Sequence, residues 1–229
     1  MWQNKQKAVT FSYDDGHNSD KRLVEMLDRH GLKCTFNINS ALMGNGRDEF
    51  WTGRYELRRL NADEARQVYT GHEVAVHGAT HPFLERLSAD EAFAELSADK
   101  LKLAEIFGTE IKGMAYPFGT YDDGVVEMVA KSGLMYARTI ESSKNFELQS
   151  DLLRFKPTCH HDDPELFDLA QRFLDSTPDK PMLFYIWGHT FEFCTDDDPN
   201  IHWERMERFC KMISGHDDVF YGTNSEVLL

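Results

Sequence analysis

The stretch AVTFSYDDG, residues 8–16, decides the fold because it joins a strand-length apolar run to two adjacent acids and a glycine. Similar runs recur along the chain and alternate with amphipathic helical stretches. The strand-like segments are Ala8–Tyr13, Cys34–Ile38, Val74–Val76, Gly113–Tyr116, Met135–Thr139, Leu152–Phe155, Met182–Trp187 and Val219–Tyr221. The helical patterns cover residues 19–30, 62–70, 88–107, 121–132, 164–175 and 203–214. Repeated β-then-α units predict an α/β fold with a mainly parallel sheet, either open or closed into a barrel.

Length and composition bound the class of protein. At 229 residues, the whole chain, 1–229, is expected to form a single domain with a full hydrophobic core. The net charge is −14, with 39 acidic against 25 basic residues. A negative field repels nucleic acid and anionic membrane surfaces, so neither is expected as a partner. A neutral substrate such as a sugar stays open.

The ends and the cysteines of the chain give expectations about its compartment. No stretch of about 18 apolar residues exists, so no membrane span is expected. The first residues show no signal-peptide core, which favours a cytoplasmic protein if the chain is complete and an extracytoplasmic one if a signal peptide was removed. Cys34 and Cys210 lie in apolar patterns and are expected to be reduced core thiols. Nothing in the sequence indicates an oligomeric state.

Several chemically active side chains follow the predicted strands. Asp14 and Asp15 end the first strand and His77 follows the third. Tyr116 ends the fourth strand and His189 ends the seventh. In α/β barrels the active site forms at the carboxyl ends of the strands. These residues are therefore expected to converge on one mouth.

A His-x-x-x-His pair, His77 and His81, has the spacing of two metal ligands. On a helical turn these positions share one face, and with one carboxylate they form a three-ligand set that leaves positions open for water and substrate. A second carboxylate is then free to act as a base. Adjacent acids reach one site only where the strand turns, and Gly16 supplies that turn. The pattern predicts a metal-dependent hydrolase.

Four segments carry a family resemblance. SYDDGH (12–17), HGATHP (77–82), AYPFGTY (115–121) and IWGHTF (186–191) resemble, in order, the motifs of the polysaccharide deacetylase family. That family is also called the NodB-homology group or carbohydrate esterase family 4. The resemblance implies a distorted (β/α) barrel with about seven parallel strands. It also implies a hydrolase that removes N- or O-linked acetyl groups from a carbohydrate.

The same resemblance assigns roles to residues. Asp15, His77 and His81 would bind a divalent metal, expected to be Zn²⁺, with Co²⁺, Ni²⁺ and Mn²⁺ as alternatives. Asp14 would be the general base. His189 would be the general acid that protonates the leaving group, a role that suits an imidazole because its ordinary pKa is about 6.5.

The sequence departs from the family pattern at two places. Trp187 stands where the family often has a leucine that lines the acetyl-methyl pocket. Ala115 stands where many members carry an arginine that orients the catalytic aspartate. Asp14 then needs another partner, and Arg138 and Arg154, at or near later strand ends, are the candidates.

Further residues are expected near the substrate. Tyr116 and Pro117 belong to the Tyr-Pro-x-Gly form of the third motif, and the backbone N–H near Tyr116 is a candidate oxyanion donor. Four aromatic residues are expected either to form a sugar-stacking platform or to lie in the core: Trp51, Tyr55, Phe191 and Phe193. His17 is expected either to touch substrate or to face water. His160 and His161 are expected either to reach the mouth or to precede a helix as structural residues.

Two other functions compete with this prediction. One is a metal-independent hydrolase of a small amide with the same fold, and the other is a non-catalytic relative that binds carbohydrate. Intact candidates for ligands, base and acid favour the enzyme. The expected partner is an acetylated oligo- or polysaccharide, and the sequence does not distinguish N-acetylglucosamine polymers, peptidoglycan, acetylated xylan and short oligosaccharides.

Overall fold

The computed structural model describes residues 2–44, 56–194 and 200–229. Its strands are β1 (Lys7–Asp14), β2 (Cys34–Ile38), β3 (Glu73–Val76), β4 (Gly113–Ala115), β5 (Tyr136–Arg138), β6 (Cys159–His160), β7 (Met182–His189) and β8 (Val219–Tyr221). Its α-helices are α1 (Asp20–Arg29), α2 (Ala62–Val68), α3 (Ala89–Phe107), α4 (Asp123–Lys131), α5 (Leu166–Asp175), α6 (Asn200–Ile213) and α7 (Asn224–Leu228). The predicted alternation of strands and helices is confirmed.

The sixth predicted strand is wrong. Leu152–Arg154 forms a 3-10 turn, in which the Asp151 side chain accepts a hydrogen bond from the Leu153 backbone N–H at 3.2 Å. The strand lies later, at Cys159–His160. Leu152, Leu153 and Phe155 are apolar and Phe155 is buried in the core, but an apolar, buried segment can be a strand or a turn. The short final helix α7 was not predicted.

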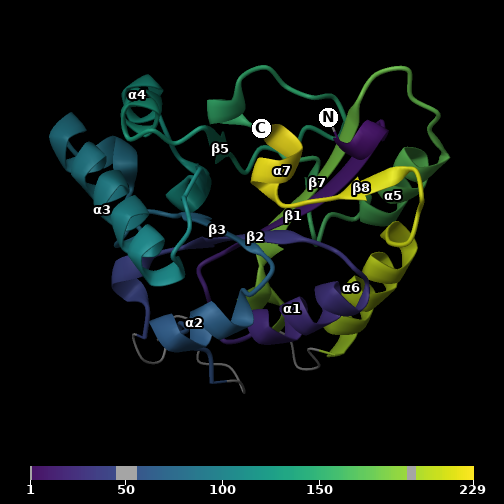
Figure 1. Cartoon of the computed structure of the whole chain (residues 1–229), viewed down its shortest axis with the longest axis horizontal. Coiled ribbons are helices and arrows are strands. Elements are labelled where there is room, and N and C mark those ends of the chain that lie inside the picture. Colours follow the sequence, from purple (N-terminus) through teal and green to yellow (C-terminus); the bar gives the residue numbers. More distant parts are fainter. Residues whose placement is uncertain (1, 45–55, 195–199) are drawn as a thin grey trace.

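The sheet is parallel and curls on itself. Its strand order is β5-β4-β3-β2-β1-β7-β6, and β8 pairs with the first three residues of β1. Phe155 N–H donates to Ala137 O at 3.0 Å, and Thr139 N–H donates to Phe155 O at 2.9 Å. These bonds link β5 to the segment that leads into β6. Figure 1 shows the resulting curved arrangement, with α1 and α6 on one side and α3 and α4 on another. The predicted distorted barrel is confirmed.

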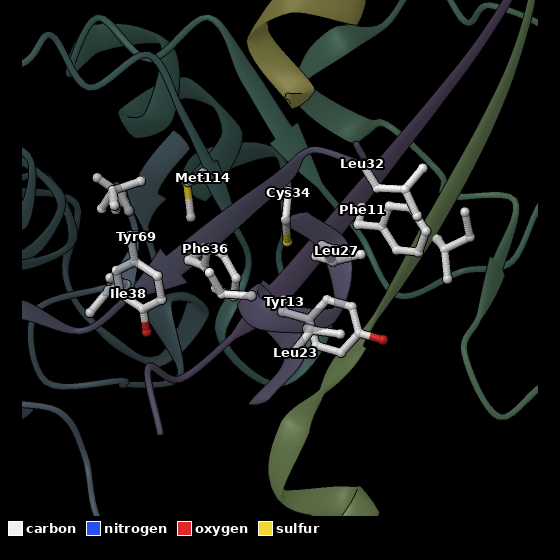
Figure 2. Close-up of a cluster of buried hydrophobic side chains, with 14 of the residues drawn as sticks. Phe11, Tyr13, Leu23, Leu27, Leu32, Cys34, Phe36, Ile38, Tyr69 and Met114 are labelled. Carbon is white, nitrogen blue, oxygen red and sulfur yellow. The ribbon is translucent and has the colours of Figure 1, made fainter. Parts of the chain in front are cut away.

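The outward face of β1 is apolar because helices cover it. Phe11 and Tyr13 pack in one buried cluster with Leu23 and Leu27 of α1, as Figure 2 shows. Strands of a parallel sheet are buried on both faces, so β1 has no solvent-exposed side. Removal of this apolar surface from water holds α1 against the sheet.

The inward face of β1 is polar. Thr10, Ser12 and Asp14 alternate with the apolar positions and are buried. Each has a partner, since Thr10 donates to Asn224 Oδ1 of α7 at 2.9 Å and Asn37 Nδ2 of β2 donates to Ser12 Oγ at 2.8 Å. Buried polar groups need such hydrogen bonds. The inward face of β1 is therefore hydrogen-bonded from Thr10 to Asp14, whereas Ala8 belongs to a small apolar cluster with Leu183 and Tyr185.

The strand register determines which residues lie side by side on neighbouring strands. Asp14 pairs with His189 across β1 and β7 and with Asn37 across β1 and β2. Ala115 pairs with Arg138 across β4 and β5. These residues are the last or near-last residues of their strands, so their side chains lie at one end of the barrel.

The structure also bears on the predictions about the cysteines and about a membrane span. The four cysteines are free thiols, and Cys34 and Cys210 are buried, as predicted. In the described ranges, no helix combines the length and apolar character that crossing a membrane requires.

Candidate active site

A cavity of about 540 Å³ opens at the carboxyl ends of the strands. Its lining residues are Asp14, Asp15, Arg59, His77, His81, Tyr116, Phe118, Gly119, Ile140, Trp187, His189 and Phe191. All five residues that the sequence assigns to metal binding or proton transfer are among them. The predicted convergence of distant strand ends on one mouth is confirmed.

The two adjacent acids reach the cavity through an unusual backbone turn. Asp14 is the last residue of β1, and Asp15 has a φ of +81°. A non-glycine residue in this region costs of order 1–3 kcal/mol. Gly16 follows with a φ of +71°, so the turn predicted at Gly16 begins one residue earlier, at Asp15. The strained residue directs the second carboxylate to the same side as the first.

Asp15, His77 and His81 bring three ligand atoms together. The Asp15 Oδ1 atom lies 4.0 Å from His77 Nε2 and 3.8 Å from His81 Nε2, and the two imidazole nitrogens are 3.2 Å apart. The three atoms lie within 4.8 Å of one another. His77 Nδ1 lies 2.8 Å from Ala115 O, where it can donate a hydrogen bond and leave Nε2 as a lone-pair donor. This second contact is typical of a metal-ligating histidine.

The charge states of these three residues also suit a cation. Burial lowers the pKa of His77, and burial together with His77 lowers the pKa of His81 to about 4, so both imidazoles are neutral. Burial raises the pKa of Asp15, but the Arg59 guanidinium and the nearby histidines outweigh it, and the net pKa is lowered. Metal ligands must be deprotonated. Two neutral imidazoles and one carboxylate are the donor set of a divalent ion such as zinc.

The histidine pair does not lie on a helical turn, contrary to the sequence analysis. Gly78 has a φ of +72° and His81 a φ of +57°, so the segment is a tight loop. Asn39 Nδ2 donates to His77 O at 2.6 Å and to Gly78 O at 2.7 Å and holds this loop in place. The two imidazoles meet because the loop folds back.

Asp14 is surrounded by donors. Its Oδ2 forms an ion pair with Arg138, and its Oδ1 accepts from Asn37 Nδ2 at 2.8 Å. Burial raises its pKa, but the Arg138 charge and the two nearby histidines outweigh burial, so the pKa of Asp14 is lowered. Asp14 is an ionised carboxylate with one oxygen 3.9 Å from His77 Nε2 and 3.8 Å from His189 Nε2.

Only one of the two candidate arginines reaches Asp14. Arg138, on β5, is 1% exposed and points into the barrel, where its guanidinium lies 4.5 Å from the centre of the Trp187 ring. Arg154, the other predicted candidate, does not contact Asp14. It pairs with Asp123 at 2.6 Å and Asp151 at 2.9 Å, because its 3-10 turn directs it to the surface.

A sequence model of the polysaccharide deacetylase family matches residues 3–137, more than half of the chain. The chain belongs to the polysaccharide deacetylase family. It is 29% identical to a chitooligosaccharide deacetylase of a Bradyrhizobium strain over 131 residues, which cover 56% of this chain and 53% of that protein. The chain covers 23–53% of the length of the curated relatives it matches.

Solved structures agree on the fold. A family 4 carbohydrate esterase from Streptomyces lividans, in complex with acetate, has a TM-score of 0.55 and 16% identity and covers 96% of this chain and 92% of its own. A family 4 pseudoenzyme from Bacillus anthracis has a TM-score of 0.58 and 18% identity and covers 99% of this chain and 66% of its own. At such identities the likeness shows the polysaccharide deacetylase fold alone.

Glu192 is a site residue that the sequence analysis missed. It lies three residues after His189 in a 3-10 turn, and its Oε2 accepts from the His189 backbone N–H at 2.9 Å. Its Oε1 lies 3.3 Å from His189 Nδ1. Burial lowers the pKa of His189, but the carboxylates of Glu192 and Asp14 outweigh it and raise the pKa. The His-x-x-Glu spacing was the available signal, and it is weak outside a known turn.

Arg59 is a second missed residue, and it lies shortly before helix α2. Its guanidinium donates to Asp15 Oδ1 at 3.1 Å and to Asn39 Oδ1 at 2.7 Å. Arg59 therefore connects the candidate metal ligand to the loop that carries His77. A loop arginine gives no sequence signal for such a contact, because its target depends on how the loop folds.

The third family motif provides fewer groups for binding substrate than predicted. Tyr116 lines the cavity, but its backbone N–H donates to Arg138 O at 3.1 Å and its hydroxyl to Leu153 O at 2.8 Å. The expected oxyanion donor at Tyr116 is therefore already engaged in the sheet. Pro117 is buried and begins the following turn. In that turn Phe118, which was not predicted, is 47% exposed at the cavity and stacks on Phe83 at 3.9 Å.

Of the four aromatic residues expected to form a platform or to lie in the core, the structure describes two. Phe191 lines the cavity, as does Trp187, the expected wall of the acetyl-methyl pocket. Phe193 does not, because it is buried against Trp203 at a ring distance of 4.6 Å. Trp51 and Tyr55 lie outside the described residues.

The structure also decides between the alternatives predicted for His17 and for the pair His160 and His161. His17 is 1% exposed and packs edge-on against Phe191, so it neither faces water nor lines the cavity. His160 and His161 lie beside the mouth, where each approaches Glu192. The histidine pair before helix α5 therefore contacts the site through a carboxylate.

Proposed function

We propose that this chain is a metal-dependent hydrolase that removes acetyl groups, N- or O-linked, from a carbohydrate. One observation carries the proposal. Asp14, an ionised and buried carboxylate, lies between the three candidate ligands and His189, with its Oδ2 3.8 Å from His189 Nε2. A base and an acid thus face one cavity beside a metal-binding donor set.

Asp15, His77 and His81 would hold the ion, with zinc as the expected metal and cobalt, nickel and manganese as alternatives. A divalent ion there would polarise an acetyl carbonyl and lower the pKa of water. Asp14 would accept the proton of the attacking water, because a carboxylate that does not bind the metal keeps its basicity. Arg138 and Asn37 fix the direction of its oxygens.

His189 would deliver a proton to the departing nitrogen or oxygen. Its raised pKa favours the imidazolium form, and its Nε2 faces the cavity while Nδ1 faces Glu192. Trp187 and Phe191 give the cavity apolar walls that suit an acetyl methyl group and a sugar face. The substrate class is an acetylated oligo- or polysaccharide.

Acetate release from acetylated chito-oligosaccharides and xylan tests the proposal. With Asp14→Asn we expect a rate lower by about 10²–10⁴, the usual contribution of a general base, and an unchanged metal content by plasma mass spectrometry. With His77→Ala we expect loss of metal as well as activity. His216→Gln, on the loop before β8, is the control and should behave as wild type. Near-native turnover by Asp14→Asn would reject the assigned base.

A further inference from the structure

A second cluster of possible ligands lies on the other side of His189. It consists of His160 at the end of β6, His189 at the end of β7 and Glu192 in the following turn. We propose that these three side chains bind a second divalent ion, of the zinc class, and that its binding blocks proton donation by His189. The inhibition rests on the proposed function, whereas the binding does not.

The distances fit one ion. His160 Nε2 lies 3.1 Å from Glu192 Oε2, and His189 Nδ1 lies 3.3 Å from Glu192 Oε1. One ligand atom from each of the three residues lies within 4.8 Å of the others. Ligands at about 2.1 Å in a tetrahedral zinc site are about 3.4 Å apart. Two imidazole nitrogens and one carboxylate oxygen therefore have the spacing and chemistry of a zinc donor set.

The hydrogen bonding around this cluster points the same way. His161 is 1% exposed, and among the described residues neither of its ring nitrogens has a partner with hydrogen-bond geometry. Its Nε2 lies 3.4 Å from Glu192 Oε2. His189 Nδ1 is likewise buried without such a partner in the described ranges. Buried imidazole nitrogens usually have hydrogen bonds, and these two rings meet at Glu192.

Solvent reaches the cluster at His160 and Glu192, so an ion can enter from that side, whereas His189 Nδ1 itself is buried. The side chains of His160, His189 and Glu192 are 23%, 21% and 27% exposed. The cluster is also separate from the first donor set, because the two nitrogens of His189 face opposite ways. Nε2 lies toward Asp14, and Nδ1 lies toward Glu192.

This orientation explains how an ion at the second site would inhibit. An imidazole bonded to a metal through Nδ1 has no free lone pair there for a proton. Zinc binding would displace the Nδ1 proton of His189 to solvent, so the ring would be neutral with a single proton on Nε2 and could not act as an imidazolium acid. Glu192, which raises the pKa of His189, would bind the ion at the same time.

Zinc stoichiometry tests the site without any substrate. Equilibrium dialysis against excess zinc, with metal analysis, is run on wild type, His160→Phe, His77→Ala and the double variant. Phenylalanine keeps the edge-on contact of residue 160 with Trp187, whose ring centre is 4.7 Å away, but cannot bind metal. We expect two equivalents in wild type, one in each single variant and none in the double variant. His216→Gln is the control and should bind two.

A wild type that binds one equivalent, or a His160→Phe variant that still binds two, would overturn the proposal. The inhibitory part is measured as the ratio of acetate-release rates with and without excess zinc. We expect a drop of about tenfold or more in wild type, since a general acid contributes about 10²–10⁴, and none in His160→Phe. If zinc inhibits both proteins equally, the inhibitory site is wrong. If neither protein releases acetate, the proposed function fails, and the stoichiometry still decides the binding.

Discussion

Replacement of Arg138 by methionine should destabilise the protein strongly. Arg138 and Asp14 are 1% and 2% exposed and form an ion pair inside the barrel. Methionine fills much of the same space but leaves the Asp14 carboxylate buried without a counter-charge. Removal of one partner of a buried pair costs about 3–5 kcal/mol. The change also removes the guanidinium from the Trp187 ring, a contact worth about 2 kcal/mol when desolvated.

A double-mutant cycle separates these contributions. Arg138→Met, Asp14→Asn and the double variant are unfolded in urea, and their free energies of unfolding are compared. The double variant has no buried unpaired charge, so we expect it to be more stable than the sum of the single effects by about 2 kcal/mol or more. In a chain of this size the loss of the ion pair alone should lower Tm by roughly 6–20 °C, at about 2–4 °C per kcal/mol.

Arg154→Met is the matched control. Arg154 pairs only with surface carboxylates among the described residues, Asp123 and Asp151, and exposed ion pairs contribute about 0–1 kcal/mol. Equal costs for the two arginine variants, or additive effects of Arg138→Met and Asp14→Asn, would refute the view that a buried ion pair organises the site.

Three further perturbations have definite expected outcomes. Glu192→Gln removes the charge that raises the pKa of His189, so the alkaline limb of the pH–rate profile should move to lower pH; an unmoved limb would exclude this role. Asp20 is buried, and burial raises its pKa to about 6, so the folded state binds this proton more tightly than the unfolded state does. Its contribution to stability is therefore fully present well below pH 4 and lost as pH rises through 6. The stability of wild type relative to Asp20→Asn should fall by about 2–3 kcal/mol between pH 4 and 7 in urea titrations, whereas a flat difference would contradict the shift. Gly188→Ala would place a Cβ 1.8 Å from His161 Nδ1 and should lower the free energy of unfolding by about 1–3 kcal/mol or more, measured by thermal unfolding. An unchanged Tm would show that His161 moves aside without cost.

The sequence was enough to predict the fold and which side chains gather at the mouth of the barrel, because both depend on local patterns. Parallel strands place their carboxyl ends together, so residues that follow apolar runs converge without knowledge of the register. The prediction of the sixth strand was wrong because Phe155 is buried without being part of an extended strand. The histidine pair was predicted in the right place with the wrong backbone, since ligand spacing does not distinguish a helical turn from a loop.

The partners of the site residues could be identified only from the three-dimensional structure. Arg138 and Arg154 look equivalent in sequence, and the level of β5 in the barrel decides which one meets Asp14. Arg59 comes from a loop, whose path no periodic pattern fixes. Glu192 follows His189 by three residues, but the carboxylate turns back to that histidine only because the chain forms a 3-10 turn there.

These partners explain how an acid and a base can lie close together in opposite protonation states. Asp14 Oδ2 and His189 Nε2 are 3.8 Å apart. A proton shared between them would leave neither residue ready for its proposed step. Arg138 lowers the pKa of Asp14, and Glu192 raises that of His189, so the proton stays on the imidazole. Pairs of titratable groups whose surroundings separate their pKa values are typical of acid–base catalysis. In this chain the separation comes from two charged residues outside the four family motifs.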